Sequence, residues 1–170
     1  ILDSLIRRDR QAHWVPCEPD STKRRNHERL AALATLAGGE LKRSILSKIE
    51  GSAAQFLPSA SDYSEDLAHT ISGSSEPGTV AALEPDLMGE FFVLEQLKDI
   101  EQGWDNVGRQ AFCEVALAQG GDRAVESLLR TAFDFPERAK KLGWLLPAPD
   151  GQTGALQAAS GAAVDLTSRL

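Results

Sequence analysis

The stretch from Leu83 to Leu97 constrains the fold more than any other part of this sequence. A proline suited to a first helical turn is followed by apolar side chains on nearly every side of the expected helix. Such a helix has to be surrounded by other elements. Aromatic residues make up only 6% of the chain, yet two phenylalanines stand next to each other here. We therefore predict a buried central helix, the lever helix, whose key residues are Leu87, Met88, Glu90, Phe91, Phe92 and Leu94.

Composition and charge describe an ordinary globular protein with an uneven charge distribution. The 170 residues are 42% hydrophobic and 25% charged, which is enough for one domain or two small ones. The net charge is −7, although residues 1–50 carry ten Lys or Arg against seven Asp or Glu. The remainder is therefore strongly acidic and repels phosphate backbones, so nucleic acid is not expected as the main partner.

The residues that carry chemistry form no catalytic constellation. Cys17 and Cys113 are too few for a disulfide framework, and no signal peptide or membrane-spanning run is visible, so a cytoplasmic location without a membrane partner is expected. His13, Cys17 and His27 fall short of the four ligands of a structural metal site. The apolar neighbours of Cys113 predict a buried, inert thiol rather than a nucleophile. We predict no metal site and no catalytic residue.

Upstream of the lever helix, the pattern predicts helices separated by turn signals and one weak strand. Three short helices, a Gly/Pro-rich turn and a strand are the order of a winged helix, although a plain helical bundle has much the same pattern. We predict a linking helix and loop over 1–20 and a winged-helix-like domain over 21–98. The expected elements are a helix over Ile1–Trp14 ended by the prolines at 16 and 19, a helix over Thr22–Ala37 ended by Gly38 and Gly39, a third with Leu41, Ile45 and Ile49 on one face, a fourth with Tyr63, Leu67 and Ile71 capped by Ser61 or Asp62, and a strand over Thr79–Leu83.

Downstream of the lever helix, the sequence again predicts helices. They are expected at about 108–119, 122–134 and 136–143, followed by a Pro/Gly linker over 147–154 and a last helix lined by small residues. Small residues allow close packing, as in helical repeats, although one unit does not establish a period. We predict a helical, possibly repeat-like region over 99–170 and a mainly α fold. The stripe expected to be buried on the 122–134 helix consists of Val125, Leu128, Leu129 and Ala132.

The segment from Leu83 to Val93 resembles a motif of the STAND class of signal-transduction P-loop ATPases, which includes NACHT and NB-ARC-like proteins. In that class the winged helix ends in an aromatic residue, a histidine two residues later, and a buried helix with a glutamate-aromatic pair. Leu83 and Pro85 stand at the first two positions, and Glu90-Phe91 form the pair. The runs 31–39 and 84–90, with the helix over 1–14, are also similar to a bacterial subgroup of these ATPases.

The resemblance implies a regulatory segment that couples an upstream nucleotide-binding core to a downstream helical sensor in bacterial signalling or defence. Pro85 and Asp86 stand where the family's nucleotide-sensing motif lies, but proline has no N–H donor for the phosphates that the family's histidine contacts. This segment has no Gly-rich loop followed by Lys and Ser or Thr. No cofactor is expected on the segment alone, ADP or ATP is expected on the upstream core, and self-association is expected on activation.

Two other functions stay open from the sequence. A stand-alone winged-helix or helical module would bind protein or nucleic acid, and an enzyme would use Cys113 or the acids near His69. The helix at the recognition position, over 62–71, carries three acids and no Lys or Arg, which argues against DNA readout. The basic run is interpreted as a solvated face or as a docking surface for the upstream domain, and it consists of Lys23, Arg24, Arg25 and Arg29.

Overall fold

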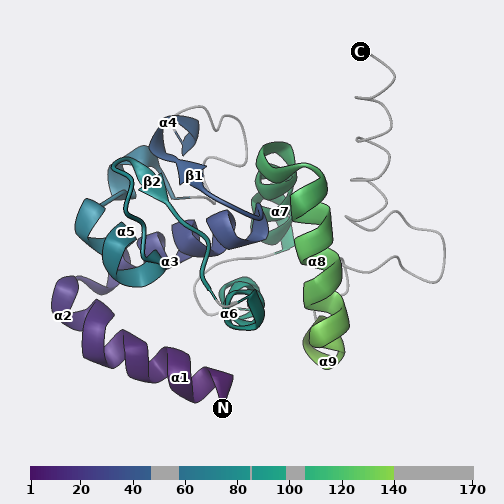
Figure 1. Ribbon diagram of the computed structural model, residues 1–170, viewed down its shortest axis with the longest axis horizontal. Helices are drawn as coiled ribbons and strands as arrows, with labels where there is room; N and C mark the ends of the chain where they lie inside the picture. The colour runs from purple at the N-terminus through teal and green to yellow at the C-terminus, as the bar shows by residue number, and fades with distance from the viewer. Residues whose placement is uncertain (47–57, 85, 99–105, 140–170) are drawn as a thin grey trace.

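The computed structural model describes residues 1–46, 58–84, 86–98 and 106–139, and within them the chain is mainly α-helical (Figure 1). Its two short strands pair into one antiparallel ladder. The elements are α1 (Leu2–Asp9), a π-helical turn (Arg10–Trp14), α2 (Val15–Cys17), α3 (Ser21–Leu36), β1 (Leu41–Lys42), α4 (Arg43–Leu46), a 3-10 turn (Ala60–Asp62), α5 (Glu65–Ser72), β2 (Thr79–Val80), α6 (Asp86–Lys98), α7 (Asn106–Gly120), α8 (Asp122–Asp134) and α9 (Pro136–Ala139).

The first helix runs through Pro16 to Cys17, so its predicted end at Trp14 was wrong. A regular helix is disturbed by proline, which lacks an N–H and clashes with the carbonyl four residues back. Here the turn directly before Pro16 is π-helical, and the N–H of Val15 bonds to the carbonyl of Arg10, five residues back. The wider turn accommodates the proline, and the helix continues to Cys17.

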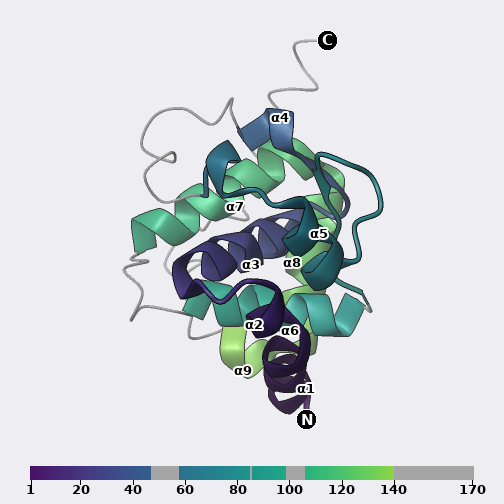
Figure 2. The same cartoon turned by 90° about the vertical axis from the view of Figure 1, so that its left-hand side faces the viewer.

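Helix α3 is the centre of the fold and begins and ends as predicted to within one residue. The carboxylate of Asp20 accepts hydrogen bonds from the N–H groups of Thr22 and Lys23 and so caps the start. At the other end Gly38 has a positive φ of 74°, which lets Gly39 donate to the carbonyl of Ala34. Helices α5, α6, α7 and α8 all pack against α3, which Figure 2 shows running through the middle of the molecule.

The strand ladder ties the segment after α3 to the segment after α5. Leu41 pairs with Val80 and Lys42 with Thr79 in antiparallel register. The strand predicted over Thr79–Leu83 is therefore present but shorter. Leu41 was wrongly placed on a helix, because its four-residue spacing to Ile45 does not separate a strand that runs directly into α4 from one longer helix.

The fourth predicted helix is present as α5, but its cap differs. The hydroxyl of Ser64 accepts from the N–H of Leu67, whereas Asp62 closes the preceding 3-10 turn through a capping box with Ser59. Leu67 and Ile71 are buried as expected. Tyr63 lies outside the helix, where its hydroxyl accepts from the N–H of Gly78 at 3.0 Å.

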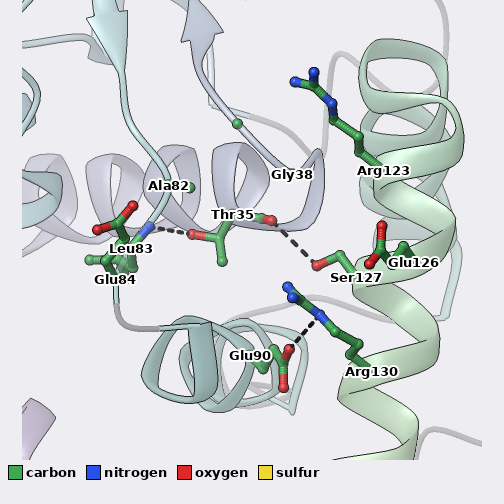
Figure 3. Close-up of a pocket in the computed structure, with 11 residues that line it drawn as sticks. Thr35, Gly38, Ala82, Leu83, Glu84, Glu90, Arg123, Glu126, Ser127 and Arg130 are labelled. Carbon is green, nitrogen blue, oxygen red and sulfur yellow. Dashed lines mark hydrogen bonds and ion pairs between the residues drawn. The ribbon is translucent and has the colours of Figure 1, made fainter.

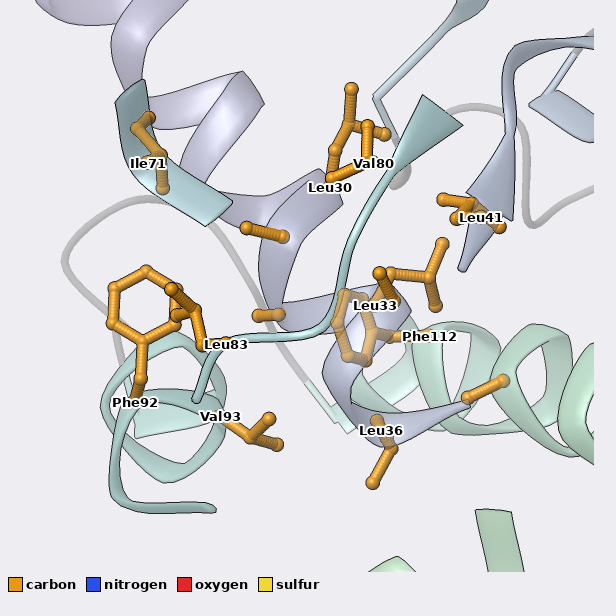
Figure 4. Packing of buried hydrophobic residues seen from close by; sticks show 14 of the residues in the cluster. Leu30, Leu33, Leu36, Leu41, Ile71, Val80, Leu83, Phe92, Val93 and Phe112 are labelled. Carbon is orange, nitrogen blue, oxygen red and sulfur yellow. The ribbon is translucent and has the colours of Figure 1, made fainter. Parts of the chain in front are cut away.

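One hydrophobic cluster extends from the first helix to α8, and Figure 4 shows its middle, where side chains of α3, the β ladder, α6 and α7 meet. The predicted boundaries at 20 and 98 therefore fall within one continuous core. The division of the chain into three domains at these boundaries stays a prediction. Among the largest fully buried side chains are Leu30, Leu33 and Leu36 of α3, Phe92, Leu94 and Leu97 of α6, and Phe112 of α7.

The predicted stripe on α8 is confirmed in part, since Leu128 is buried as expected and Val125 and Ala132 are half-buried. Ala124, Leu128 and Thr131 are buried, whereas Leu129 is exposed. The start of α8 lies close to the turn after α3, since a Cβ on Gly38 would come within 2.7 Å of the Arg123 Cβ. The predicted helix over 136–143 is present as α9 as far as Ala139. The linker over 147–154, the last helix, and the two tryptophans at 104 and 144 lie outside the described residues.

Candidate functional site at the junction of α3, α6 and α8

A pocket of about 380 Å³ lies where the end of α3, the segment 82–84, α6 and α8 meet. Figure 3 shows arginines at positions 123 and 130 and Glu126 reaching from α8, and Glu90 reaching from α6. The residues that line the pocket include two arginines and three glutamates, so its wall is charged and nearly balanced.

Thr35 joins three segments at the back of this pocket. Its hydroxyl donates to the carbonyl of Ala31 at 2.8 Å and accepts from the N–H of Leu83 at 2.9 Å. Its own carbonyl accepts from the hydroxyl of Ser127 at 3.4 Å. The same carbonyl, in the last turn of α3, also accepts from the N–H of Gly38 at 3.0 Å. One residue therefore sets how α6 and α8 meet the end of α3.

Glu90 of α6 forms an ion pair with Arg130 of α8, with 3.1 Å between Oε1 and Nε. The Glu90 side chain is only 2% exposed, whereas that of Arg130 is 45% exposed. A buried carboxylate is expensive unless it is paired, so this contact favours one particular docking of α8 on α6. Sequence reasoning identified Glu90 but missed Arg130, because their pairing depends on the α6–α8 packing.

The pocket wall combines charged side chains with one hydroxyl that is already hydrogen-bonded. Its lining, as described, contains neither histidine nor cysteine, and the Ser127 hydroxyl points its hydrogen bond at a backbone carbonyl. An activated hydroxyl nucleophile is hydrogen-bonded to a base, whereas the Ser127 hydroxyl donates to the Thr35 carbonyl. The arginines instead complement the C-terminal end of α3 and the buried Glu90 carboxylate.

The structure places most of the predicted lever residues in the core but turns one of them outward. Phe91, Phe92 and Leu94 are buried, and Met88 is partly buried. Leu87 is 47% exposed, so its prediction as a core residue was wrong. It lies in the first turn of α6, before the helix passes between its neighbours. Of the predicted nucleotide-sensing position, Asp86 is the first residue of α6, and Pro85 lies outside the described residues.

The predicted basic docking residues lie on the first half of α3, next to the N-terminal helix. Lys23 is exposed, whereas Arg24, Arg25 and Arg29 are half-buried. A guanidinium nitrogen of Arg24 donates to the carbonyl of Glu18 at 2.6 Å, so this arginine holds the loop between α2 and α3. The basic run is thus partly structural, and docking by its exposed members stays a prediction.

The candidate metal ligands and the candidate nucleophile have different surroundings. His27 is fully buried, Cys17 is exposed, and no group of three ligating side chains is found within the described ranges. Cys113 is buried, as predicted, and burial raises the pKa of its thiol far above the ordinary value. A thiol held in that state is a poor nucleophile.

Burial also lowers the pKa of His27, to about 4 from an ordinary value of 6.5. Its Nε2 donates to the carbonyl of Ser64 at 3.1 Å, and no hydrogen bond to the buried Nδ1 is found among the described residues. The folded state therefore favours the neutral imidazole. The contribution of His27 to the free energy of unfolding is present above pH 6.5 and is lost as the pH falls toward 4.

We expect the free energy of unfolding to fall by about 2 kcal/mol between pH 7 and pH 5 through this histidine. Urea titrations of the His27→Gln variant should show a flatter dependence, since the amide donates to Ser64 without titrating. The matched control is His13→Gln, because His13 is exposed. Equal slopes for the wild type and His27→Gln would contradict the prediction.

No helix within the described ranges has both the length and the apolar character needed to cross a membrane. In comparisons with known proteins, the chain matches no family model, no curated protein and no solved structure.

Proposed function

We propose that this chain is the non-catalytic regulatory segment of a STAND-type ATPase, coupling the nucleotide state of an upstream P-loop core to a downstream helical sensor. The supporting observation is the position of α6. It packs against α1, α3 and α8, which come from the linking helix, the middle and the C-terminal helical part of the chain. A displacement at either end of α6 would be transmitted to all three, because packed cores do not deform continuously.

The order of elements supports a winged-helix-like middle domain within this proposal. Helix α3 is followed by β1, then by α4 and α5, and then by β2, which returns to pair with β1. The helix at the recognition position is α5, and Glu65 and Asp66 are both exposed or half-exposed in its first turn. Negative charge there favours a protein neighbour over a phosphate backbone.

The exposed Leu87 marks the surface that would meet the upstream core. It lies next to Asp86, at the position that the resemblance assigns to nucleotide sensing. In this proposal ADP or ATP is held by the upstream core, this chain contributes no cofactor contact of its own, and activation leads to self-association. Signalling or defence in bacteria is the setting that the resemblance suggests.

The test uses the full-length protein encoded by the natural reading frame that contains this chain. We expect Leu87→Asp to change ATP-dependent assembly several-fold, measured by light scattering with ADP or ATP, because a charge would disturb docking on the core. The thermal stability of the chain should stay unchanged, since Leu87 is half exposed and an acid suits a first helical turn. Phe133→Asp on α8 is the control, because Phe133 is 86% exposed elsewhere.

Two outcomes would overturn the proposal. A reading frame without an upstream phosphate-binding Gly-Lys loop would contradict the assignment to an ATPase. Assembly that depends neither on nucleotide nor on Leu87→Asp would contradict the proposed coupling. A stand-alone binding module would then be the better description. If the chain binds duplex DNA with an affinity that falls steeply with salt, it is a nucleic-acid-binding module. If titration with duplex DNA shows no such salt dependence, its partner is a protein.

A further inference from the structure

The N-terminal helix, α1 to α2 with its π-helical turn, is attached to the rest of the molecule by few apolar contacts. Within this helix only Ile6 and Trp14 are buried. Trp14 meets the ring of Phe92 edge-on, with 5.8 Å between the centroids. Figure 1 shows the helix lying along one side of the molecule, whereas α3 is enclosed. So small an apolar interface gives this helix a weak hydrophobic hold.

A polar contact provides the other main attachment. The Arg10 guanidinium donates to both carboxylate oxygens of Glu28, with distances of 2.9 and 2.6 Å. Glu28 belongs to α3 and is only 5% exposed. The side-chain amide of Gln96 on α6 donates to the same carboxylate at 3.4 Å. Arg10, Glu28 and Gln96 therefore join the N-terminal helix, α3 and α6 in one buried network.

The seam next to this network is incompletely filled. A hollow of about 270 Å³ lies between the N-terminal helix, α3 and α6, and its lining includes all three network residues. Arg24 and Arg25 of α3 also line it. Most of the residues that line this hollow are polar or charged, so the bidentate ion pair fixes the position of the helix together with the packing of Ile6 and Trp14.

The energetics of such a pair depend on whether both partners leave together. Removing one partner while the helix stays docked takes from Glu28 or Arg10 its bidentate hydrogen bonds in a largely buried contact, which is destabilising. Undocking the helix instead returns both groups to water, because the helix itself covers Glu28. Breaking the contact by movement is therefore much cheaper than breaking it by substitution in the closed state. A pair of this kind can open and close reversibly.

The connection to α3 has the geometry of a pivot. Glu18 and Asp20 both have extended backbone dihedral angles, between two helices. We propose that Arg10, Glu28 and Gln96 form a latch whose opening releases the N-terminal helix as one rigid unit about residues 18–20. The latch is a property of this chain and holds whatever core lies upstream. Its opening uncovers the apolar faces of Trp14 and Phe92.

Hydrogen exchange followed by mass spectrometry on the whole 170-residue chain tests the latch. In the wild type, amides of α1 to α2 should be protected, but less than those of α3. In Glu28→Gln, exchange in α1 to α2 should become roughly tenfold faster or more, while α3 keeps its protection. Arg10→Gln should act in the same way, and this substitution lies on the N-terminal helix and leaves α3 unchanged. Adding Arg10→Gln to Glu28→Gln should add little.

The exposed ion pair between Arg7 and Asp3, 3.3 Å apart on the same helix, supplies the control. Arg7→Gln should change exchange less than twofold, since surface pairs contribute little. Two results would overturn the proposal. In the first, α1 to α2 and α3 lose protection together in both variants, which is global unfolding. In the second, the helix is unprotected already in the wild type, so nothing holds it.

Discussion

Replacing Phe92 by alanine should destabilise the chain by about 3–5 kcal/mol, the range expected for truncating a fully buried phenylalanine. Phe92 is fully buried in α6, which packs against α3, and its ring meets that of Trp14 at 5.8 Å between centroids. The substitution removes the ring's transfer free energy, leaves a cavity that a close-packed core cannot refill, and removes an aromatic pair.

Urea unfolding followed by far-ultraviolet circular dichroism gives the free energy of unfolding for this comparison. The midpoint should fall while the dependence on urea stays the same, because the unfolded surface hardly changes. Phe133→Ala is the matched control, since the same truncation at an 86% exposed site should shift stability by less than about 0.5 kcal/mol. Similar losses at the two sites would contradict the packing described for α6.

Gly89→Ala should destabilise the chain by about 2 kcal/mol or more, although alanine is the better helix former. A Cβ at this position would come within 2.6 Å of the Leu83 carbonyl oxygen and 2.8 Å of the Thr35 methyl carbon. Neither atom moves freely, because Thr35 is hydrogen-bonded to the N–H of Leu83. The clash therefore outweighs the gain in helix propensity of up to about 1 kcal/mol.

Two further variants make this expectation specific. Gly39→Ala should be nearly neutral, since the nearest atom to its Cβ is an Arg123 guanidinium nitrogen at 3.8 Å. Combining Gly89→Ala with Thr35→Ser removes the crowding methyl and keeps the hydroxyl, so part of the lost stability should return. Thermal unfolding of all four proteins measures the pattern, and a stabilising Gly89→Ala would show that α6 lies farther from the 82–84 segment.

The helices could be predicted because each carries local signals. Periodic apolar residues, the turn at Gly38 and Gly39, and the cluster around Phe91 and Phe92 all depend on residues a few positions apart. The same locality explains the errors. Leu87 and Leu129 fit an apolar stripe in the sequence, but their exposure depends on which neighbours reach that side of the helix.

The candidate site was predictable only in part, because its geometry depends on tertiary contacts. Glu90 was identified through the glutamate-aromatic pair of the resemblance, whereas Arg130 looked like any surface arginine until α8 was placed against α6. The latch pairs Arg10 with Glu28, and no short-range spacing links these positions. The passage of a helix through Pro16 likewise required the π-helical turn, which has no sequence signature of its own.

The hydrogen bonds of Thr35 have a consequence for how this chain is made. Its partners Leu83 and Ser127 lie 48 and 92 residues later in the sequence. At ordinary rates of synthesis, Ser127 leaves the ribosome roughly 5 to 20 s after Thr35. Until α8 emerges, the sides of α3 and α6 that α8 covers in the folded chain stay exposed. Newly made chains should therefore depend on chaperones until α8 emerges, and stalling translation before Ser127 should yield aggregates rather than a folded N-terminal portion.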